Sequence, residues 1–215
     1  MLDKIIIRNI KLEIPENYLN LIDKLEDHDF KLYVTGGAIR NKLLGFTYSD
    51  IDLVCIGRSK DDFKEKFKGE IRILADFDNV LIYVDKMINV FAISFSESIE
   101  EDFYQRDFTI NSFIYDTRLS KLYGRDIAYT DIKNRILRPC NELNLTLITT
   151  LRGIRLSKEY NLNPINYKVL NILTGVDTKF LSLRLRNELS KHNNPLTNEL
   201  EKLVLYKIYK AKYVE

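Results

Sequence analysis

Two aspartates separated by one residue are the feature of this chain best suited to metal chemistry. Asp50 and Asp52 open an apolar run, and alternate residues of a strand point to the same face. Two carboxylates on one face repel each other unless a cation lies between them, and Mg²⁺ prefers oxygen ligands that it shares with phosphates. The spacing therefore predicts a magnesium site, although an isolated Asp-x-Asp is more often a pair of solvated surface acids.

A pair of glycines lies upstream of the acids. Gly36 and Gly37 follow an apolar segment over 31–35 and precede a helix-like stretch over 38–44. Glycine lets the backbone approach a phosphate closely, and the N-terminus of a helix favours anions. A Gly-Gly pair alone is more often a turn. The order of strand, glycines, helix and acids nevertheless predicts a site that holds a metal ion and a triphosphate.

A second polar group lies in the middle of the chain. The segment 106–112 reads Arg-Asp-Phe-Thr-Ile-Asn-Ser, and Asp107 is a good N-cap for a helix predicted over 107–114. In such a helix Arg106 and Asn111 face the phosphates and the ribose of a nucleotide. Taken alone, the segment reads as an ordinary helix start with a capping acid.

A third group lies on a long helix predicted over 143–159. Four side chains recur there every three residues and line one stripe: Thr146, Thr149, Arg152 and Arg155. Two guanidinium groups one turn apart make a planar, bidentate surface for a phosphate or a base edge. An isolated Arg-x-x-Arg is more commonly a solvated helix face.

The composition is that of an ordinary globular protein. The chain has 215 residues, of which 45% are hydrophobic and 30% charged. No apolar run reaches the roughly 18–20 residues that span a bilayer, and the N-terminus lacks a signal-peptide pattern. Cys55 and Cys140 make neither a disulfide framework nor a zinc site. We therefore expect a cytoplasmic protein with no membrane partner.

The net charge of +2 conceals an asymmetry between the two halves of the chain. Residues 133–215 carry 15 Lys and Arg against 7 Asp and Glu, whereas residues 1–132 carry 18 against 24. A basic half beside an acidic, metal-holding half suits a protein that grips a polyanion such as RNA. Lysine-rich helices also occur simply for solubility, so the charge alone leaves both readings open.

The hydrophobic pattern predicts an α+β front part and an all-helical back part. Strands are expected over 31–35, 51–56, 71–74, 80–84, 88–94 and 121–123, and helices over 16–29, 38–44 and 61–68. A polar loop is expected over 95–104. After about residue 130 the signals are helical, over 131–136, 143–159, 164–173, 179–191 and 196–212. The predicted boundary follows residue 138, at Pro139.

These three groups, in this order, resemble the motifs of the class II nucleotidyltransferases, which comprise tRNA CCA-adding enzymes and bacterial poly(A) polymerases. The family's first motif reads Gly-Gly-x-Val-Arg-Asp-x-Leu-Leu-Gly and then Asp-x-Asp, its second Arg-Arg-Asp-Phe-Thr-Ile-Asn, and its helix Leu-Arg-Ala-x-Arg. Five parts of this chain are similar to family motifs: 36–45 with 50–52, 105–111, 124–138, 151–155 and 182–189.

The resemblance implies a polymerase-β-like mixed-sheet palm with helices over residues 1–138, followed by an all-helical neck over 139–215. It implies that Asp50 and Asp52 are the catalytic residues and the Mg²⁺ ligands. The residues that it implies for nucleotide binding are Gly36, Gly37, Arg40, Arg106, Asp107, Asn111, Arg152 and Arg155. The implied activity is template-independent addition of CMP or AMP, from CTP or ATP, to an RNA 3′ end, with tRNA as the expected RNA, by two-metal phosphoryl transfer.

Several positions depart from the family pattern. Thr146 and Thr149 stand where CCA-adding relatives carry an acid and an arginine that read the incoming base, so the sequence leaves CTP against ATP open. Asn89 stands where a third carboxylate is expected, and an amide brings no negative charge. Asn41 and Gln105 also replace charged family residues.

Two alternatives to a self-sufficient enzyme follow from Asn89 and from the length of the chain, since relatives continue into body and tail domains. One is a non-catalytic RNA- or nucleotide-binding module, and the other is half of a split enzyme completed by a partner chain. Transfer of a nucleotide to a protein or a small molecule is a weaker third. The helix predicted over 196–212 carries an apolar stripe. We expect this stripe either to pack on the core of the neck or to form the interface of a homodimer.

Overall fold

A computed structural model describes residues 4–76, 80–84, 90–141 and 147–164. The chain divides into two units, 1–134 and 135–215, which are described separately. The strands of the first unit are β1 (Ile5–Asn9), β2 (Lys31–Thr35), β3 (Asp52–Ile56), β4 (Ile71–Asp76), β5 (Val80–Val84), β6 (Val90–Ser96), β7 (Phe113–Asp116) and β8 (Lys121–Arg125). Its helices are α1 (Glu16–Glu26), α2 (Gly37–Leu44), α3 (Lys60–Lys66), α4 (Ile99–Gln105), the 3₁₀ helix η1 (Thr109–Asn111) and α5 (Asp126–Lys133). The second unit contains β9 (Ile136–Leu137), α6 (Leu147–Tyr160) and β10 (Asn163–Pro164).

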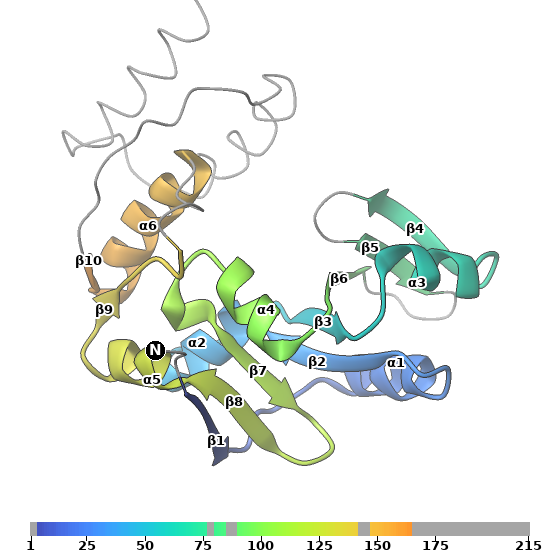
Figure 1. The fold of residues 1–215 in the computed structure, drawn as a ribbon, viewed down its shortest axis with the longest axis horizontal. Helices are drawn as coiled ribbons and strands as arrows, with labels where there is room; N and C mark the ends of the chain where they lie inside the picture. Colours follow the sequence, from blue (N-terminus) through green and yellow to red (C-terminus); the bar gives the residue numbers. More distant parts are fainter. Residues whose placement is uncertain (1–3, 77–79, 85–89, 142–146, 165–215) are drawn as a thin grey trace, which may run out of the picture. The chain divides into compact units, whose positions relative to one another are not determined.

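Eight strands among the described residues form one mixed sheet in the order β1-β8-β7-β2-β3-β6-β5-β4 (Figure 1). β3 and β6 are parallel, and the other neighbouring strands pair antiparallel. Parallel neighbours need a crossover, and here α3 and the β4–β5 hairpin supply it. The predicted α+β class with a mixed sheet is confirmed.

The central strand β3 is buried on both faces. Leu53, Val54 and Cys55 are almost fully enclosed, as expected of an apolar run in the middle of a sheet. Burial raises the pKa of the Cys55 thiol to about 12, so this cysteine is a core residue rather than a nucleophile.

Helices α1 and α3 cover one face of the sheet. Tyr18 of α1 packs edge-on against Phe91 of β6, with ring centroids 4.9 Å apart. Phe63 of α3 packs against Phe95 of the same strand at 5.4 Å. α3 begins at Ser59, whose side chain and backbone form a capping box with Asp62. Aromatic contacts therefore join both helices to β6.

Helix α4 covers part of the other face (Figure 1). Phe103 of α4 forms a buried cluster with Val54 of β3 and Ile114 of β7. The helix is held at its start by Ser98, whose hydroxyl accepts the N–H of Glu101 at 3.1 Å. Residues 95–104, predicted to be a polar loop, thus include a helix. The prediction was wrong because the acidic residues, which suggested a solvated loop, occupy the first turn of the helix. There the helix dipole stabilises negative charge.

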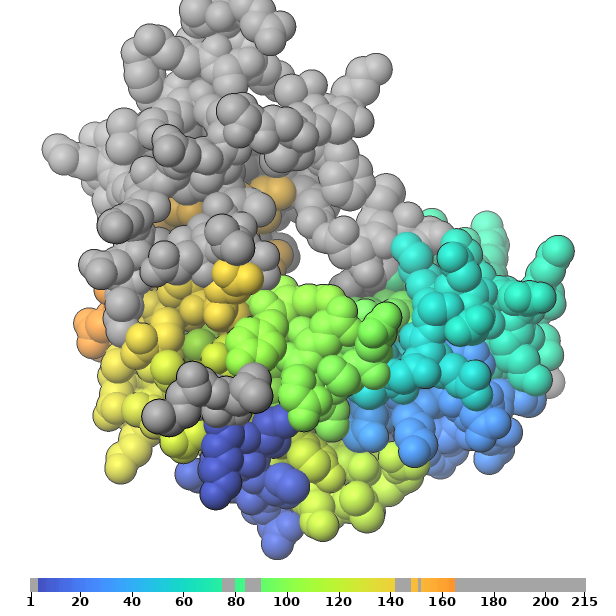
Figure 2. Space-filling model, in the orientation of Figure 1, coloured from blue at the N-terminus to red at the C-terminus, as the bar shows by residue number. Residues whose placement is uncertain are grey.

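The helix predicted over 107–114 is also wrong. The carboxylate of Asp107 accepts the N–H of the next residue, Phe108, at 2.8 Å, and only the short η1 follows. β7 then begins at Phe113 and pairs with β2 and β8. Pairing with distant strands here overrides the local helical pattern. β1, which pairs with β8, was not predicted from the sequence. In Figure 2 the dark blue surface of β1 lies beside the yellow-green surface of β8.

The described part of the second unit is built around α6, which confirms the helix predicted over 143–159 as far as it is described. β9 and β10 form a short parallel pair that was not predicted. Arg135 joins them to the helix, since its Nη1 donates to the carbonyl oxygen of Tyr160 at 2.9 Å. The helices predicted beyond residue 164, and Thr146, lie outside the described residues. In the described part of the chain no helix is long and apolar enough to cross a bilayer.

Candidate active site

The turn between β2 and α2 brings the glycine pair to the acids. Gly36 has φ 74° and ψ −136°, a conformation that L side chains rarely adopt. A Cβ atom at this position would lie 3.1 Å from Oδ2 of Asp52. This closeness follows from the strand register, because Thr35 pairs directly with Asp52. The glycine is therefore required both by its backbone conformation and by the neighbouring carboxylate.

Asp50 and Asp52 lie at the start of β3 with their side chains exposed. The residue between them, Ile51, is 3% exposed and anchors the segment in the core. Asp52 is the first residue of β3, so its side chain points to the face opposite to that of Leu53, whereas Asp50 precedes the strand. Ser49 donates a hydrogen bond to Oδ1 of Asp50 at 3.3 Å. The convergence of the two carboxylates on one cation stays a prediction.

This donor set suits a hard divalent cation. Two carboxylates supply part of an octahedral shell, and water with phosphate oxygens supplies the rest. Among the described residues, no group of three or more His, Cys, Asp and Glu side chains is arranged around a common point. Asn89, the position expected for a third ligand, lies outside the described residues. A divalent cation such as Mg²⁺ therefore fits the chemistry of the residues present; that Asp50 and Asp52 bind it stays a prediction.

Tyr18 is a neighbour of the acids that the sequence did not identify. Burial raises the pKa of its hydroxyl, a backbone hydrogen bond with Ile51 opposes that rise, and the charges of Asp52 and Asp50 add to it. The phenol therefore lies close enough to feel both carboxylates and stays protonated at neutral pH. In the sequence it is one more apolar position at helical spacing on α1, so no local signal distinguishes it.

A chain of hydrogen bonds joins the first motif to the second. Arg40 of α2 is 9% exposed, and its Nη1 donates to Oδ1 of Asn111 at 2.8 Å. Asn111 in turn donates through Nδ2 to Oδ1 of Asp107 at 2.8 Å. Nε and Nη2 of Arg40 donate to Oδ1 of Asn41 at 3.2 and 2.9 Å. Two segments separated by 71 residues in the sequence thus form one polar network.

Arg40 lies directly beside the glycine turn. A Cβ atom on Gly37 would lie 3.4 Å from Nη2 of Arg40. Asn41, which stands where the family carries an acid, donates through its amide to the carbonyl of Thr47 at 2.9 Å. The amide thereby links α2 to the loop that leads to Asp50. Through these hydrogen bonds Arg40 holds α2 against the second motif. Its contact with the triphosphate stays a prediction.

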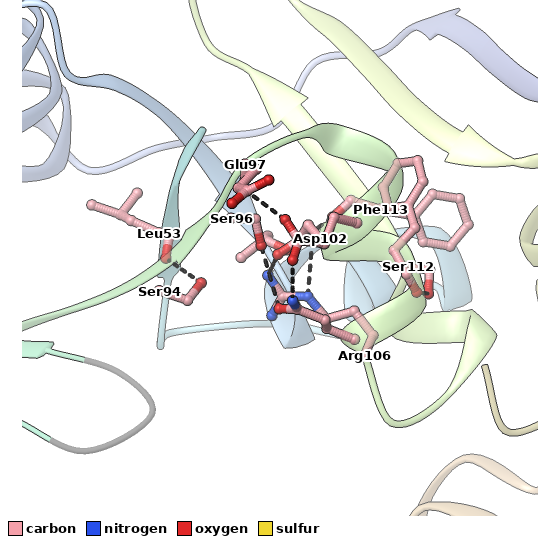
Figure 3. A network of polar contacts seen from close by, with 12 residues as sticks. Leu53, Ser94, Ser96, Glu97, Asp102, Arg106, Ser112 and Phe113 are labelled. Atoms are coloured by element: carbon pink, nitrogen blue, oxygen red, sulfur yellow. Dashed lines mark hydrogen bonds and ion pairs between the residues drawn. The ribbon is translucent and has the colours of Figure 1, made fainter. Parts of the chain in front are cut away.

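Arg106 is held by a carboxylate of its own helix. Its Nε donates to Oδ2 of Asp102 at 3.0 Å, and its Nη2 pairs with the other oxygen. Figure 3 shows the guanidinium of Arg106 lying against Asp102, near Ser96 at the end of β6. Asp102 is 3% exposed, so the pair is largely shielded from water. This bidentate pair sets the direction of Arg106; its predicted contact with a nucleotide stays a prediction.

Arg152 and Arg155 lie on α6 in the second unit, both partly buried. Nη1 of Arg155 pairs with Oε2 of Glu159, one turn further on, at 3.1 Å. Thr149 is also partly buried on the same helix. The structure describes these residues separately from the acids, so their predicted part in nucleotide binding stays a prediction.

A groove of about 830 Å³ runs beside the loop that carries the acids. Its wall includes Lys42, Phe46, Tyr48, Ser49 and Ile51. Neither glycine and neither acid lines it, so it is distinct from the candidate metal site.

A family model covers most of the first unit, including all of the residues assigned above to the acids, the glycines and the second motif. The model of the Gabija anti-defense 2 family matches residues 12–135. This chain belongs to the Gabija anti-defense 2 family. The match begins just before α1 and ends at the boundary between the two units.

Curated relatives of this family member include proteins named CCA-adding enzyme and CC-adding tRNA nucleotidyltransferase. The CCA-adding enzyme of Streptococcus suis is 25% identical over 186 residues, which cover 76% of this chain and 45% of the relative. The CC-adding tRNA nucleotidyltransferase of Halalkalibacterium halodurans is 27% identical over 131 residues, which cover 59% of this chain and 33% of the relative. The chain thus spans less than half the length of these relatives.

Solved structures of CCA-adding enzymes have the same fold. The complex of a CCA-adding enzyme with CTP matches with a TM-score of 0.68 and 25% identity, over 98% of this chain and 56% of that one. The Thermotoga maritima CCA-adding enzyme in complex with tRNA matches with a TM-score of 0.67 and 24% identity, over 98% of this chain and 57% of that one. The resemblance of this Gabija anti-defense 2 family member to class II nucleotidyltransferases is confirmed.

Proposed function

We propose that this chain is a template-independent nucleotidyltransferase that adds CMP or AMP, from CTP or ATP, to an RNA 3′ end, with tRNA as the acceptor. The observation that carries the proposal is the approach of Asp52 to the glycine turn, where a Cβ on Gly36 would lie 3.1 Å from the carboxylate. A metal ligand and a turn open to a polyphosphate are thereby adjacent. The relatives named CCA-adding enzymes support the same chemistry.

The reaction needs little covalent chemistry from the protein. The RNA 3′-hydroxyl attacks the α-phosphorus of the nucleotide, a phosphodiester bond forms, and pyrophosphate leaves. Asp50 and Asp52 would hold Mg²⁺ for two-metal phosphoryl transfer, and the bound metal would supply a lowered pKa of the hydroxyl and neutralisation of the charge on the phosphates. Gly36 and Gly37 let the backbone come close to the phosphates. Arg40 keeps this turn in place through its hydrogen bonds to the second motif.

The test is nucleotide incorporation by the purified chain with Mg²⁺, labelled CTP or ATP, and tRNA that lacks its terminal nucleotides. We expect 3′ extension by the wild type and none by Asp52→Asn, which keeps the side-chain volume but lowers the charge at the metal site. Extension with ATP alone indicates an A-adding role. No extension with either nucleotide, in the presence of Mg²⁺ or Mn²⁺, rejects catalysis by the chain alone, and extension only after a second protein is added favours the split-enzyme alternative.

A second candidate function follows from the family match over residues 12–135. The family name indicates action against the Gabija defence. In that role the proposed nucleotide site either transfers a nucleotide to an RNA or binds its ligand without turnover. Protection can be measured in cells that carry the Gabija system and express the wild type or Asp50→Ala. Protection that survives Asp50→Ala indicates a role independent of the metal site, and protection that is lost with a normally folded variant indicates that the metal site is used.

A further inference from the structure

The strand pairing extends the face of the sheet that carries Asp52 as far as the edge strand β4. Asp52 of β3 pairs with Ala92 of β6, and Ala92 pairs with Leu81 of β5. Residues directly opposite each other on neighbouring strands point to the same side of a sheet. Leu81 therefore stands on the face that carries Asp52, two strands away.

The same face continues along β5 and β6 to an arginine. Val90 lies two residues before Ala92 and pairs with Tyr83, and Tyr83 pairs with Arg72 of β4. We call this group of four side chains the outer platform: Leu81, Tyr83, Val90 and Arg72. At a spacing of about 4.8 Å between strands, Leu81 lies roughly 10 Å and Arg72 roughly 14 Å from the strand of the acids.

Apart from Arg72, the side chains of the outer platform are aliphatic or aromatic, whereas a solvated sheet face is normally polar. Leu81 is 36% exposed and Val90 48%, and Tyr83 is partly exposed. The residues between them on the opposite face, such as Ile82 and Phe91, are fully buried. A half-exposed antiparallel sheet usually alternates apolar-in with polar-out, so exposed apolar residues on the outer side indicate a binding surface.

We propose that the outer platform binds the unpaired 3′ end of the RNA acceptor. This proposal rests on the proposed function, because that function places the reacting 3′-hydroxyl at Asp50 and Asp52. The nucleotides that precede the hydroxyl then have to leave the acids along an adjacent surface. On the other side of β3 the same face is covered by α4, whose Phe103 packs on Val54 and Ile114, and the outer platform continues it on the exposed side.

The side chains of the outer platform suit single-stranded RNA. Aromatic and aliphatic surfaces accept the faces of unpaired bases in a manner that tolerates any sequence, and arginine contacts the backbone phosphates. Tyr83 provides the ring, Leu81 and Val90 extend it towards the acids, and Arg72 supplies the charge at the edge strand. A stacked strand rises about 3.4 Å per nucleotide, so about four nucleotides cover the distance of roughly 14 Å from the strand of the acids to Arg72.

Three variants test the platform. Tyr83→Ala removes the ring, the double variant Leu81→Gln with Val90→Gln makes the face polar at similar bulk, and Arg72→Ala removes the charge. The matched control is Leu119→Gln, because Leu119 is 55% exposed and lies in the β7–β8 turn, at the end of the sheet opposite to the acids. Thermal unfolding confirms that each variant is folded.

Two measurements are made on each variant. Fluorescence anisotropy of a short 5′-labelled single-stranded RNA, without nucleotide, gives the RNA Kd, and incorporation assays give the KM for RNA and for the nucleotide. We expect Tyr83→Ala to raise the RNA Kd and KM by about fivefold to a hundredfold while the nucleotide KM stays within about twofold. Arg72→Ala is expected to lower the slope of log Kd against log salt by about one. The control is expected to match the wild type.

The outcomes separate the two proposals. A wild type that incorporates nucleotides, with platform variants whose RNA Kd equals that of Leu119→Gln, overturns the platform and leaves the enzyme. Such variants with a changed oligomeric state assign the face to another copy of the chain and also overturn the RNA platform. A wild type that incorporates nothing, but whose RNA binding is weakened by the platform variants, overturns the enzyme and supports the RNA surface.

Discussion

Substitution of Gly36 by alanine tests the geometry of the candidate metal site most directly. The residue has φ 74° and ψ −136°, and a Cβ atom would meet Oδ2 of Asp52 at 3.1 Å. Ordinary contacts of a Cβ begin near 3.4 Å, so the carboxylate has to move by about 0.3 Å or more. Gly36→Ala therefore strains the backbone and displaces a metal ligand at once.

The two effects have different magnitudes. Holding an L residue in this backbone conformation costs about 1–3 kcal/mol, which lowers the Tm by roughly 2–12 °C for a chain of this size. A displacement of about 1 Å in a reacting group costs on the order of a hundredfold in rate, so the smaller shift here predicts a loss of about tenfold or more. The loss of activity is expected at a temperature where the variant is still folded.

Gly57→Ala is the matched control. Gly57 also has a positive φ, 79°, but a Cβ atom there meets nothing within 4 Å. It shares the backbone strain without touching a ligand. Nucleotide incorporation is measured for both variants over a series of Mg²⁺ concentrations, alongside thermal unfolding. Both are expected to lose stability, and only Gly36→Ala is expected to lose activity and to need more Mg²⁺.

The reasoning is refuted if Gly36→Ala keeps activity within about threefold of Gly57→Ala at equal Mg²⁺, because the carboxylate then does not depend on the absence of a side chain. A large loss of activity in both variants refutes it equally, since strain rather than ligand displacement then explains the result.

Three further predictions concern stability. Arg40→Lys removes the planar fork that donates to Asn111 and is expected to cost about 1–3 kcal/mol, read as a lower Tm. Burial raises the pKa of Glu26, whose Oε2 pairs with Arg118 and whose Oε1 has no hydrogen-bond partner in the described part of the chain. Because its folded pKa lies above its unfolded one, the wild type is expected to gain Tm relative to Glu26→Gln as the pH falls from 7 towards about 4.5, and an unchanged Tm difference contradicts this. Gly124→Ala places a Cβ against the ring of Phe113 in β7 and is expected to lower the free energy of unfolding by about 1–3 kcal/mol, measured by chemical denaturation. A denaturation midpoint equal to that of the wild type contradicts this close contact.

Much of the central sheet could be predicted from local pattern. The strands at 31–35, 51–56 and 80–84 are short apolar runs bounded by turn residues, and the structure has strands at these places. Their signal is local because it depends on burial of adjacent side chains. The site residues of the first motif could be proposed for the same reason, since the glycines and acids stand close together in the chain.

Elements whose stability depends on distant partners could not be predicted. β1 was not predicted although its three consecutive isoleucines favour a strand, and its pairing with β8, more than a hundred residues later, is what only the structure shows. The first two residues of β7 fell inside the helix predicted over 107–114, and pairing with β2 and β8 makes them part of a strand. Tyr18 could not be identified as a neighbour of the acids, because its closeness to them depends on how α1 packs on β6.

The amino-acid sequence by itself determined the chemistry that this protein can offer: two carboxylates, a glycine pair, and polar residues in two motifs. Only the tertiary structure decided which of them meet. The register of β2 with β3 sets Asp52 against Gly36, and packing of α2 beside η1 joins Arg40 to Asn111. Residue types are a property of the chain, whereas the separation of two side chains depends on which strands and helices pack together.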